Sequence, residues 1–187
     1  VETGEVSNSD KLKIGYFSQN LEEMSGHSAL EEVKSAQPRF SVVQAELARI
    51  EALLSEPMDD EEMAKVLERY GELQAEFENM GGYELESKAA EILTGLGIGP
   101  EDYIRPVETF SGGWKMRIAL AKILIINPDL LLMDEPTNHL DVESIMWLEQ
   151  WLKGFEGAVL MTSHDREFMN QIVSKIIEVA NQRIHLY

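Results

Sequence analysis

The chain has 187 residues, of which 44% are apolar and none is cysteine, and its formal net charge is −18. This length fits one domain, or one domain with a substantial insertion, and the lack of cysteine excludes disulfides and thiolate metal sites. The charge argues against autonomous DNA binding, because phosphates would be repelled, and no apolar run approaches the roughly 18 residues of a membrane span. We therefore expect a cytoplasmic protein without a membrane partner.

The first predicted element is a strand over residues 11–18, because polar and apolar side chains alternate there, with Ile14 and Phe17 on opposite faces. The strand leads into Gln19. A neutral amide at this place either ligates Mg²⁺ or positions water, or it is an ordinary surface residue. We assign residues 1–24 to this core strand and the loop that carries the glutamine.

Residues 40–80 change to a period of about 3.5, which predicts two helices packed as an antiparallel hairpin. Asp59, with Glu62 three residues later, resembles an N-terminal capping pattern for the second helix. The two helices are separated by Pro57. Their apolar stripes consist of Phe40, Val43, Leu47, Ile50 and Leu54, and of Met63, Val66, Tyr70, Leu73, Phe77 and Met80.

This short arm is acidic, with eleven Asp or Glu against three Arg or Lys between residues 40 and 80. Contact with RNA would therefore need a protein partner, the few basic residues or bound cations. A hairpin that merely packs on its own body is an equally good interpretation. Beyond Gly81 and Gly82, a further helix is predicted over residues 84–94, and we assign residues 25–110 to a helical subdomain that carries the arm.

Strands and helices alternate in residues 111–187, which we assign to a C-terminal α/β core. The alternation predicts a doubly wound α/β fold with a parallel sheet, whose ligands bind at the carboxyl ends of the strands. The predicted elements are strands over 130–133 and 158–162, helices over 113–126, 141–155 and 165–173, and a hairpin of 175–180 with 183–187.

The string LLLMDEPTNHLD, residues 130–141, places Asp134 and Glu135 at the end of a buried strand. Two adjacent acids at such a place can divide their work. One can hold Mg²⁺ while the other orients or deprotonates an attacking water. Turn chemistry alone also explains an Asp-Glu pair, but it does not explain the whole string.

A second string, FSGGWKMR, begins a predicted helix with Ser111, Gly112 and Gly113. Ser111 is expected to cap the helix, and two residues without side chains let a phosphate approach the free N–H groups closely. The same tripeptide also serves as an ordinary loop-to-helix junction. His164 follows the last buried strand, where it either reaches a phosphate or water, or is a structural histidine.

Taken in sequence order, these strings resemble an ABC ATPase domain of the P-loop NTPase type. The resemblance assigns the Q-loop to Gln19, the signature motif to Ser111-Gly112-Gly113 and the Walker B aspartate to Asp134. It assigns the catalytic glutamate to Glu135, the D-loop to Asp141 and the switch histidine to His164. It implies ATP and Mg²⁺ as cofactors. Chemistry would fall to Glu135 and His164, metal contacts to Asp134 and Gln19, and nucleotide contacts to Ser111, Gly112, Gly113, Gln19 and Asp141.

More narrowly, EPTNHLD, SGGW, SHDREF and the helical hairpin resemble the ABC-F family, and the pattern is similar to the first of its two tandem ABC domains. In that family the signature motif contacts ATP held by the partner domain, so that active sites form when two domains close. The resemblance implies two partners, a second ABC domain of the same parent chain and the ribosome. It implies a function in translation or antibiotic protection.

The phosphate-binding pattern GxxxxGK[ST] does not occur in these 187 residues. We interpret the chain as a fragment or truncated form that begins after this loop. We expect it to hydrolyse no ATP alone, because the backbone cradle and the lysine for the phosphates are missing. The parent is expected to be an ATPase, and whether this chain is itself an enzyme stays open. Strands without their neighbours also leave self-association open.

Three other classes of function compete with this interpretation. A nucleotide-binding domain of an ABC transporter would need a membrane partner, and the hairpin and TNHLD argue against it. The head of a chromosome or DNA-repair ATPase would carry a far longer coiled coil and a charge better suited to DNA. A non-catalytic interaction module would be distinguished by a nucleotide-binding assay.

Overall fold

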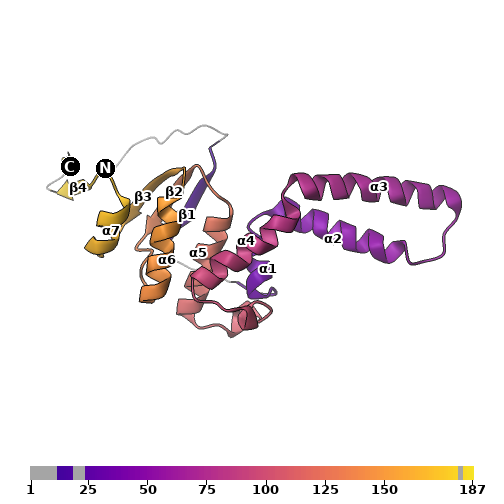
Figure 1. The fold of residues 1–187 in the computed structure, drawn as a ribbon, viewed down its shortest axis with the longest axis horizontal. Coiled ribbons are helices and arrows are strands. Elements are labelled where there is room, and N and C mark those ends of the chain that lie inside the picture. The colour runs from indigo at the N-terminus through magenta and orange to yellow at the C-terminus, as the bar shows by residue number, and fades with distance from the viewer. Residues whose placement is uncertain (1–11, 19–23, 181–182) are drawn as a thin grey trace.

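The computed structural model describes residues 12–18, 24–180 and 183–187. They form an α/β body from which a hairpin of two long helices projects (Figure 1). Gln19, for which the sequence predicts a metal or water contact, lies outside the described residues. None of the described helices has the length and apolarity needed to cross a membrane.

Three parallel strands form the central sheet, in the order β1-β2-β3. Their bounds are Ile14–Phe17 for β1, Leu130–Asp134 for β2 and Ala158–Thr162 for β3. The last residue of β2, Asp134, is paired in register with the last residue of β3, Thr162. The predicted parallel sheet is therefore confirmed, and the carboxyl ends of two strands lie side by side.

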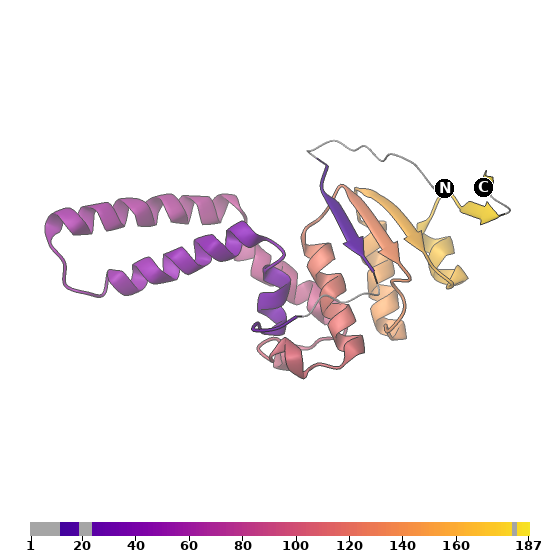
Figure 2. The same ribbon diagram turned by 180° about the vertical axis from the view of Figure 1, so that it is seen from behind.

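The helices α5 and α6 pack on one face of this sheet, which Figure 2 shows from behind. Right-handed crossovers between parallel strands that advance in one direction place both helices on the same side. Phe17, Leu131 and Met133 are buried in the main core. At Gly15, an added Cβ would lie 2.8 Å from Ile123 of α5, so the close approach of helix and strand requires glycine there. The bounds are Gly112–Ile125 for α5 and Val142–Lys153 for α6.

The predicted hairpin over residues 40–80 is confirmed as α2 (Pro38–Leu53) and α3 (Asp60–Asn79). The predicted cap is also present, because the Asp59 side chain accepts a hydrogen bond from the Glu62 N–H at 2.8 Å. Within the two helices only Phe40, Val43 and Leu73 are fully buried. Two helices alone cannot enclose a core, so the other members of the stripes stay partly exposed.

Several elements differ from their predicted bounds. Helix α1 (Ala29–Lys34) was not predicted; it is one of the short elements that complete the fold. Its signal in the sequence was a capping box, in which Ser28 and Glu31 exchange hydrogen bonds. The remaining elements are α4 (Gly82–Gly95), η1 (Pro100–Asp102), η2 (Val107–Thr109), α7 (Arg166–Ile172), β4 (Ile177–Ala180) and β5 (Arg183–Leu186). The strands β4 and β5 form the predicted antiparallel hairpin, and its turn at 181–182 lies outside the described residues.

Candidate functional site

Asp134 ends β2 with its carboxylate held by the neighbouring strand. The Thr162 hydroxyl donates to Asp134 Oδ1 at 2.6 Å, and the two residues are paired in register at the ends of neighbouring strands. Asp134 itself is exposed. One carboxylate oxygen is therefore oriented from within the protein, while the exposed group remains accessible to a cation.

Glu135 leaves the strand in a left-handed conformation, with φ at +49°. A non-glycine residue in this region costs about 1–3 kcal/mol and persists where the surroundings fix it. Here the Glu135 N–H donates to the Thr162 carbonyl at 3.1 Å and lies 3.2 Å from the Thr162 Oγ1. The strained backbone of Glu135 is thus hydrogen-bonded to the last residue of β3.

The Glu135 carboxylate turns toward His164 in the loop after β3. Glu135 Oε2 accepts a hydrogen bond from the His164 backbone N–H at 3.1 Å, and Glu135 Oε1 lies 3.3 Å from His164 Nε2. The Glu135 side chain is 13% exposed, whereas that of His164 is 97% exposed. A mostly buried carboxylate beside a fully exposed imidazole suits a base and an adjacent group that reaches a ligand.

The Ser111-Gly112-Gly113 motif begins α5, but Ser111 does not cap the helix as expected. It occupies the N-cap position, yet its side chain makes no capping hydrogen bond. Among the residues that the structure describes, the hydroxyl is therefore not used to cap the helix. Gly112 has open space where a Cβ would lie, and at Gly113 an added Cβ would lie 3.7 Å from the Cβ of His139. The start of α5 is thus open and lies against the loop between β2 and α6.

Asp141, expected to contact nucleotide, is engaged within the protein. Its Oδ1 accepts a hydrogen bond from the Ser144 N–H at 2.9 Å, which caps α6, and its Oδ2 accepts one from Arg117 Nη1 at 2.9 Å. The bond from the Ser144 backbone, followed by that from Arg117, holds the pKa of Asp141 below its ordinary value. The carboxylate is therefore charged, and each of its oxygens accepts one hydrogen bond within the protein.

The structure thus brings Asp134, Glu135 and His164 together at one edge of the sheet. Among the described residues, no hydrogen bond joins these three side chains to Ser111, Gly112 or Gly113, which form a second group around the neighbouring loop. Sequence reasoning missed Thr162, which holds both acids in place. Its signal was its position at the end of a buried strand, two residues before His164.

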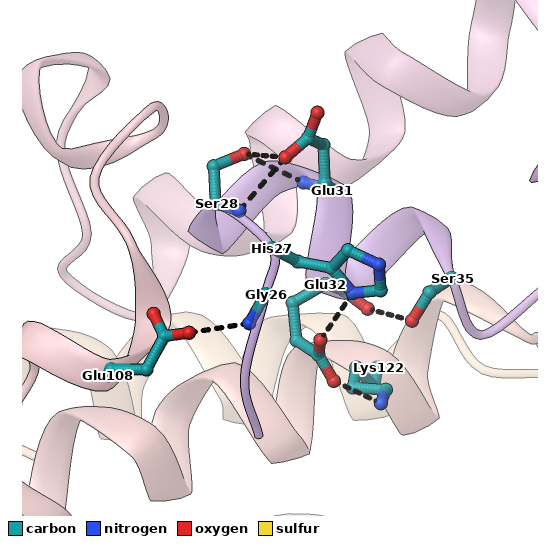
Figure 3. A network of polar contacts seen from close by, with 8 residues as sticks. All are labelled: Gly26, His27, Ser28, Glu31, Glu32, Ser35, Glu108 and Lys122. Atoms are coloured by element: carbon teal, nitrogen blue, oxygen red, sulfur yellow. Dashed lines mark hydrogen bonds and ion pairs between the residues drawn. The ribbon is translucent and has the colours of Figure 1, made fainter.

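Sequence reasoning also missed a network of polar contacts that links α1 and the segment before it to α5 (Figure 3). The buried Glu32 is hydrogen-bonded to Lys122 of α5, and its other oxygen lies 2.9 Å from Nδ1 of His27. Although burial opposes the charged form, the hydrogen bonds with Lys122 and His27 keep the pKa of Glu32 below its ordinary value. The Gly26 N–H also donates a hydrogen bond to the Glu108 side chain, so this segment also contacts η2, which precedes α5 in the chain.

The metal that the sequence implies is compatible with these residues. Mg²⁺ is usually held by one or two carboxylates together with waters and phosphate oxygens, so few protein ligands are needed. The described residues contain no cluster of three or more His, Asp or Glu side chains arranged around a metal. The exposed Asp134 supplies one suitable oxygen donor, which fits Mg²⁺ bound mainly by water and phosphate.

Several known proteins are similar to this chain in sequence or in fold. The family profile described as "ABC transporter" matches residues 2–138. "Probable ATP-binding protein YheS" of Haemophilus influenzae is 37% identical over 186 residues, which is 100% of this chain and 27% of that protein. "ABC transporter F family member 3" of Arabidopsis thaliana is 46% identical over 120 residues, which is 64% of this chain and 17% of that protein.

Among solved structures, "Structure of ATP binding subunit of ABC transporter" has a TM-score of 0.61 and 16% identity, and the match covers 92% of this chain and 57% of that chain. At this identity the likeness shows the fold alone. The chain spans only about a quarter, or less, of the length of the two sequence relatives.

Proposed function

The chain belongs to the ABC transporter family of ATPase domains, and from this premise we propose that it carries the metal-binding and water-activating residues of an ATP-hydrolysing ABC-F protein. The observation that carries the proposal is the fixed pair of carboxylates, Asp134 oriented by Thr162 and Glu135 oriented by His164. ATP and Mg²⁺ are the proposed cofactors.

Asp134 and Glu135 are suited to different parts of the reaction. The exposed Asp134 would hold Mg²⁺, which when bound neutralises phosphate charge and helps to orient the terminal phosphate. Glu135 would accept a proton from the attacking water, or orient that water, because its carboxylate is shielded from solvent and fixed on two sides. His164 would keep Glu135 oriented and, being exposed, contact the departing phosphate.

The start of α5 would contribute from the other direction. The Ser111 side chain makes no capping hydrogen bond, and the N–H groups at the start of a 14-residue helix favour an anion. We propose that Ser111, Gly112 and Gly113 contact ATP held by a second ABC domain, as the family resemblance implies. Asp141 would also act indirectly, because its carboxylate accepts hydrogen bonds from the first turn of α6 and from Arg117 of α5.

The proposal extends to the ribosome through the ABC-F resemblance of EPTNHLD, SHDREF and the arm, and one relative is named as an F-family member. In this view ATP binding closes two ABC domains, and hydrolysis lets them reopen and release the ribosome. The acidic arm would meet a basic protein surface more readily than RNA.

The test compares Asp134→Asn with Glu135→Gln in the longer protein that contains this chain, with the matching change in its second ABC domain. Asp134→Asn should weaken Mg-ATP binding, since it removes a metal ligand. Glu135→Gln should retain binding but lower turnover by about 10²–10⁴-fold, the usual contribution of a general base, and the ATP-bound protein should co-sediment with ribosomes. Lost nucleotide binding in Glu135→Gln would contradict the assigned roles, and trapped ATP without ribosome association would contradict the translation function alone.

A further inference from the structure

Arg117 of α5 is a buried charged residue that contacts three separate parts of the chain. It is 8% exposed, and its Nε donates to the His139 carbonyl at 3.0 Å. Its Nη1 donates to the Leu96 carbonyl at 3.0 Å and to Asp141 Oδ2 at 2.9 Å, and lies 3.3 Å from Ser144 Oγ. One guanidinium thus joins the end of α4, the loop before α6 and the first turn of α6.

The same side chain also touches the start of its own helix. The guanidinium carbon lies 4.4 Å from the centroid of the Trp114 ring, and Trp114 directly follows Gly113. Stacking of a guanidinium on an indole is favourable and orients both planes. Arg117 is therefore in contact with the first turn of α5 as well as with the loop between β2 and α6.

That loop has a conformation that its own residues do not favour. It begins at Glu135 with φ at +49° and contains His139 with φ at +70°. Such left-handed residues need external contacts to persist. The carbonyl of His139 is one of the groups that Arg117 binds, and the His139 side chain lies against Gly113. The contact from Arg117 therefore acts at a strained residue in the short connection between Glu135 and Asp141.

We propose that Arg117 is a positioning residue that fixes the loop carrying Glu135 to the first turn of α5, so that nucleotide contact at Ser111-Gly112-Gly113 controls the placement of the carboxylate. This deepens the proposed function and rests on it. Lysine cannot replace arginine here, because the bonds come from two nitrogens of a planar guanidinium, Nε and Nη1, and a single ammonium nitrogen cannot occupy both places.

A purely structural role would have a different outcome. If Arg117 only stabilised the core, its replacement would speed amide exchange throughout the body to an extent set by the stability lost. Other core substitutions would do the same. The matched control is Leu93→Ala, since Leu93 is fully buried in the main core on α4 and does not contact the loop through hydrogen bonds.

The experiment measures hydrogen exchange of backbone amides in this chain, and ATP turnover and affinity in the longer protein. Arg117→Lys should speed exchange in residues 136–141 by about tenfold more than in α3, because a hydrogen bond to a charged group is lost. In the longer protein it should lower kcat by about tenfold and leave the ATP affinity unchanged. Leu93→Ala should not speed exchange in this loop more than in α3. If Arg117→Lys does not fold, Ser144→Ala, which removes one acceptor, should give a smaller but loop-selective increase.

Unchanged loop exchange in the folded Arg117→Lys protein would overturn the proposal, as would faster loop exchange with an unchanged kcat. Equal loop effects from Leu93→Ala would show a structural role and overturn it as well. The proposed function fails separately, if Glu135→Gln leaves turnover intact. In that case the exchange result would still decide whether Arg117 holds the loop.

Discussion

Replacing Leu73 by aspartate should open the arm while leaving the α/β body folded. Leu73 is 0% exposed and lies outside the main core of the body. Complete burial of a leucine contributes about 1.5–3 kcal/mol, truncation to alanine costs about 2–5 kcal/mol, and an unpaired buried carboxylate costs more. A loss of about 4 kcal/mol or more is comparable with the local stability expected of a two-helix hairpin.

Two signals separate the arm from the body in this assay. The helices of the arm, of 16 and 20 residues, contribute strongly to circular dichroism, whereas all three tryptophans lie in α5 and α6 of the body. Leu73→Asp should therefore reduce helicity and speed amide exchange in α2 and α3, while tryptophan fluorescence still reports a cooperative unfolding transition.

Leu67→Asp is the matched control, because Leu67 is on the same helix and is 50% exposed. It should cost less than about 1 kcal/mol, and the partly buried Leu47→Asp should lie between the two. Equal helicity and equal melting for Leu73→Asp and Leu67→Asp would refute the reasoning, because burial would then not determine the stability of the arm.

Two other outcomes concern the body. Thr162→Val keeps the side-chain shape but removes the hydroxyl that holds Asp134, so Mg-ATP affinity in the longer protein should fall about tenfold by calorimetry, while Thr162→Ser should retain it. Burial opposes the charged form of Glu32, but hydrogen bonds with Lys122 and His27 hold its pKa in the folded protein below the ordinary value of 4.5. The charged carboxylate therefore stabilises the fold above pH 4.5. This stabilisation should be lost as the pH falls below 4.5 through the pKa of the folded protein. Urea unfolding at a series of pH values should therefore show a weaker acid dependence in Glu32→Gln than in wild type.

Much of the fold could be predicted because its signals are local. The apolar runs over 130–133 and 158–162 are too short for helices and gave two strands of the sheet, and the change of period after Phe40 gave the arm. The six-residue helix α1 was missed because it completes too few turns for a period to be visible, although Ser28 and Glu31 carried a capping signal.

The site could be predicted only in part, because its remaining features depend on contacts between distant segments. The acids and the histidine stand out as residue types after buried strands. The contacts of Arg117 with Leu96 and His139 connect residues 21 and 22 positions apart, and no period or motif indicates them. The contact of Asp141 with nucleotide, assigned by resemblance, stays a prediction, and sequence reasoning did not anticipate the bonds of its carboxylate with Arg117 and the Ser144 N–H.

The left-handed backbone at Glu135 explains how two consecutive acids can have different functions. Successive side chains in a regular strand point to opposite faces, and Asp134 keeps this geometry and pairs with Thr162. At Glu135 the positive φ breaks the alternation, and the carboxylate reaches the His164 N–H. A substitution at Glu135 can therefore change its charge, its reach or its backbone preference. Glutamine preserves reach and backbone preference and removes only the charge. Aspartate tolerates the left-handed region well but is one methylene shorter, so a loss of activity in Glu135→Asp would report the distance to His164 rather than the backbone.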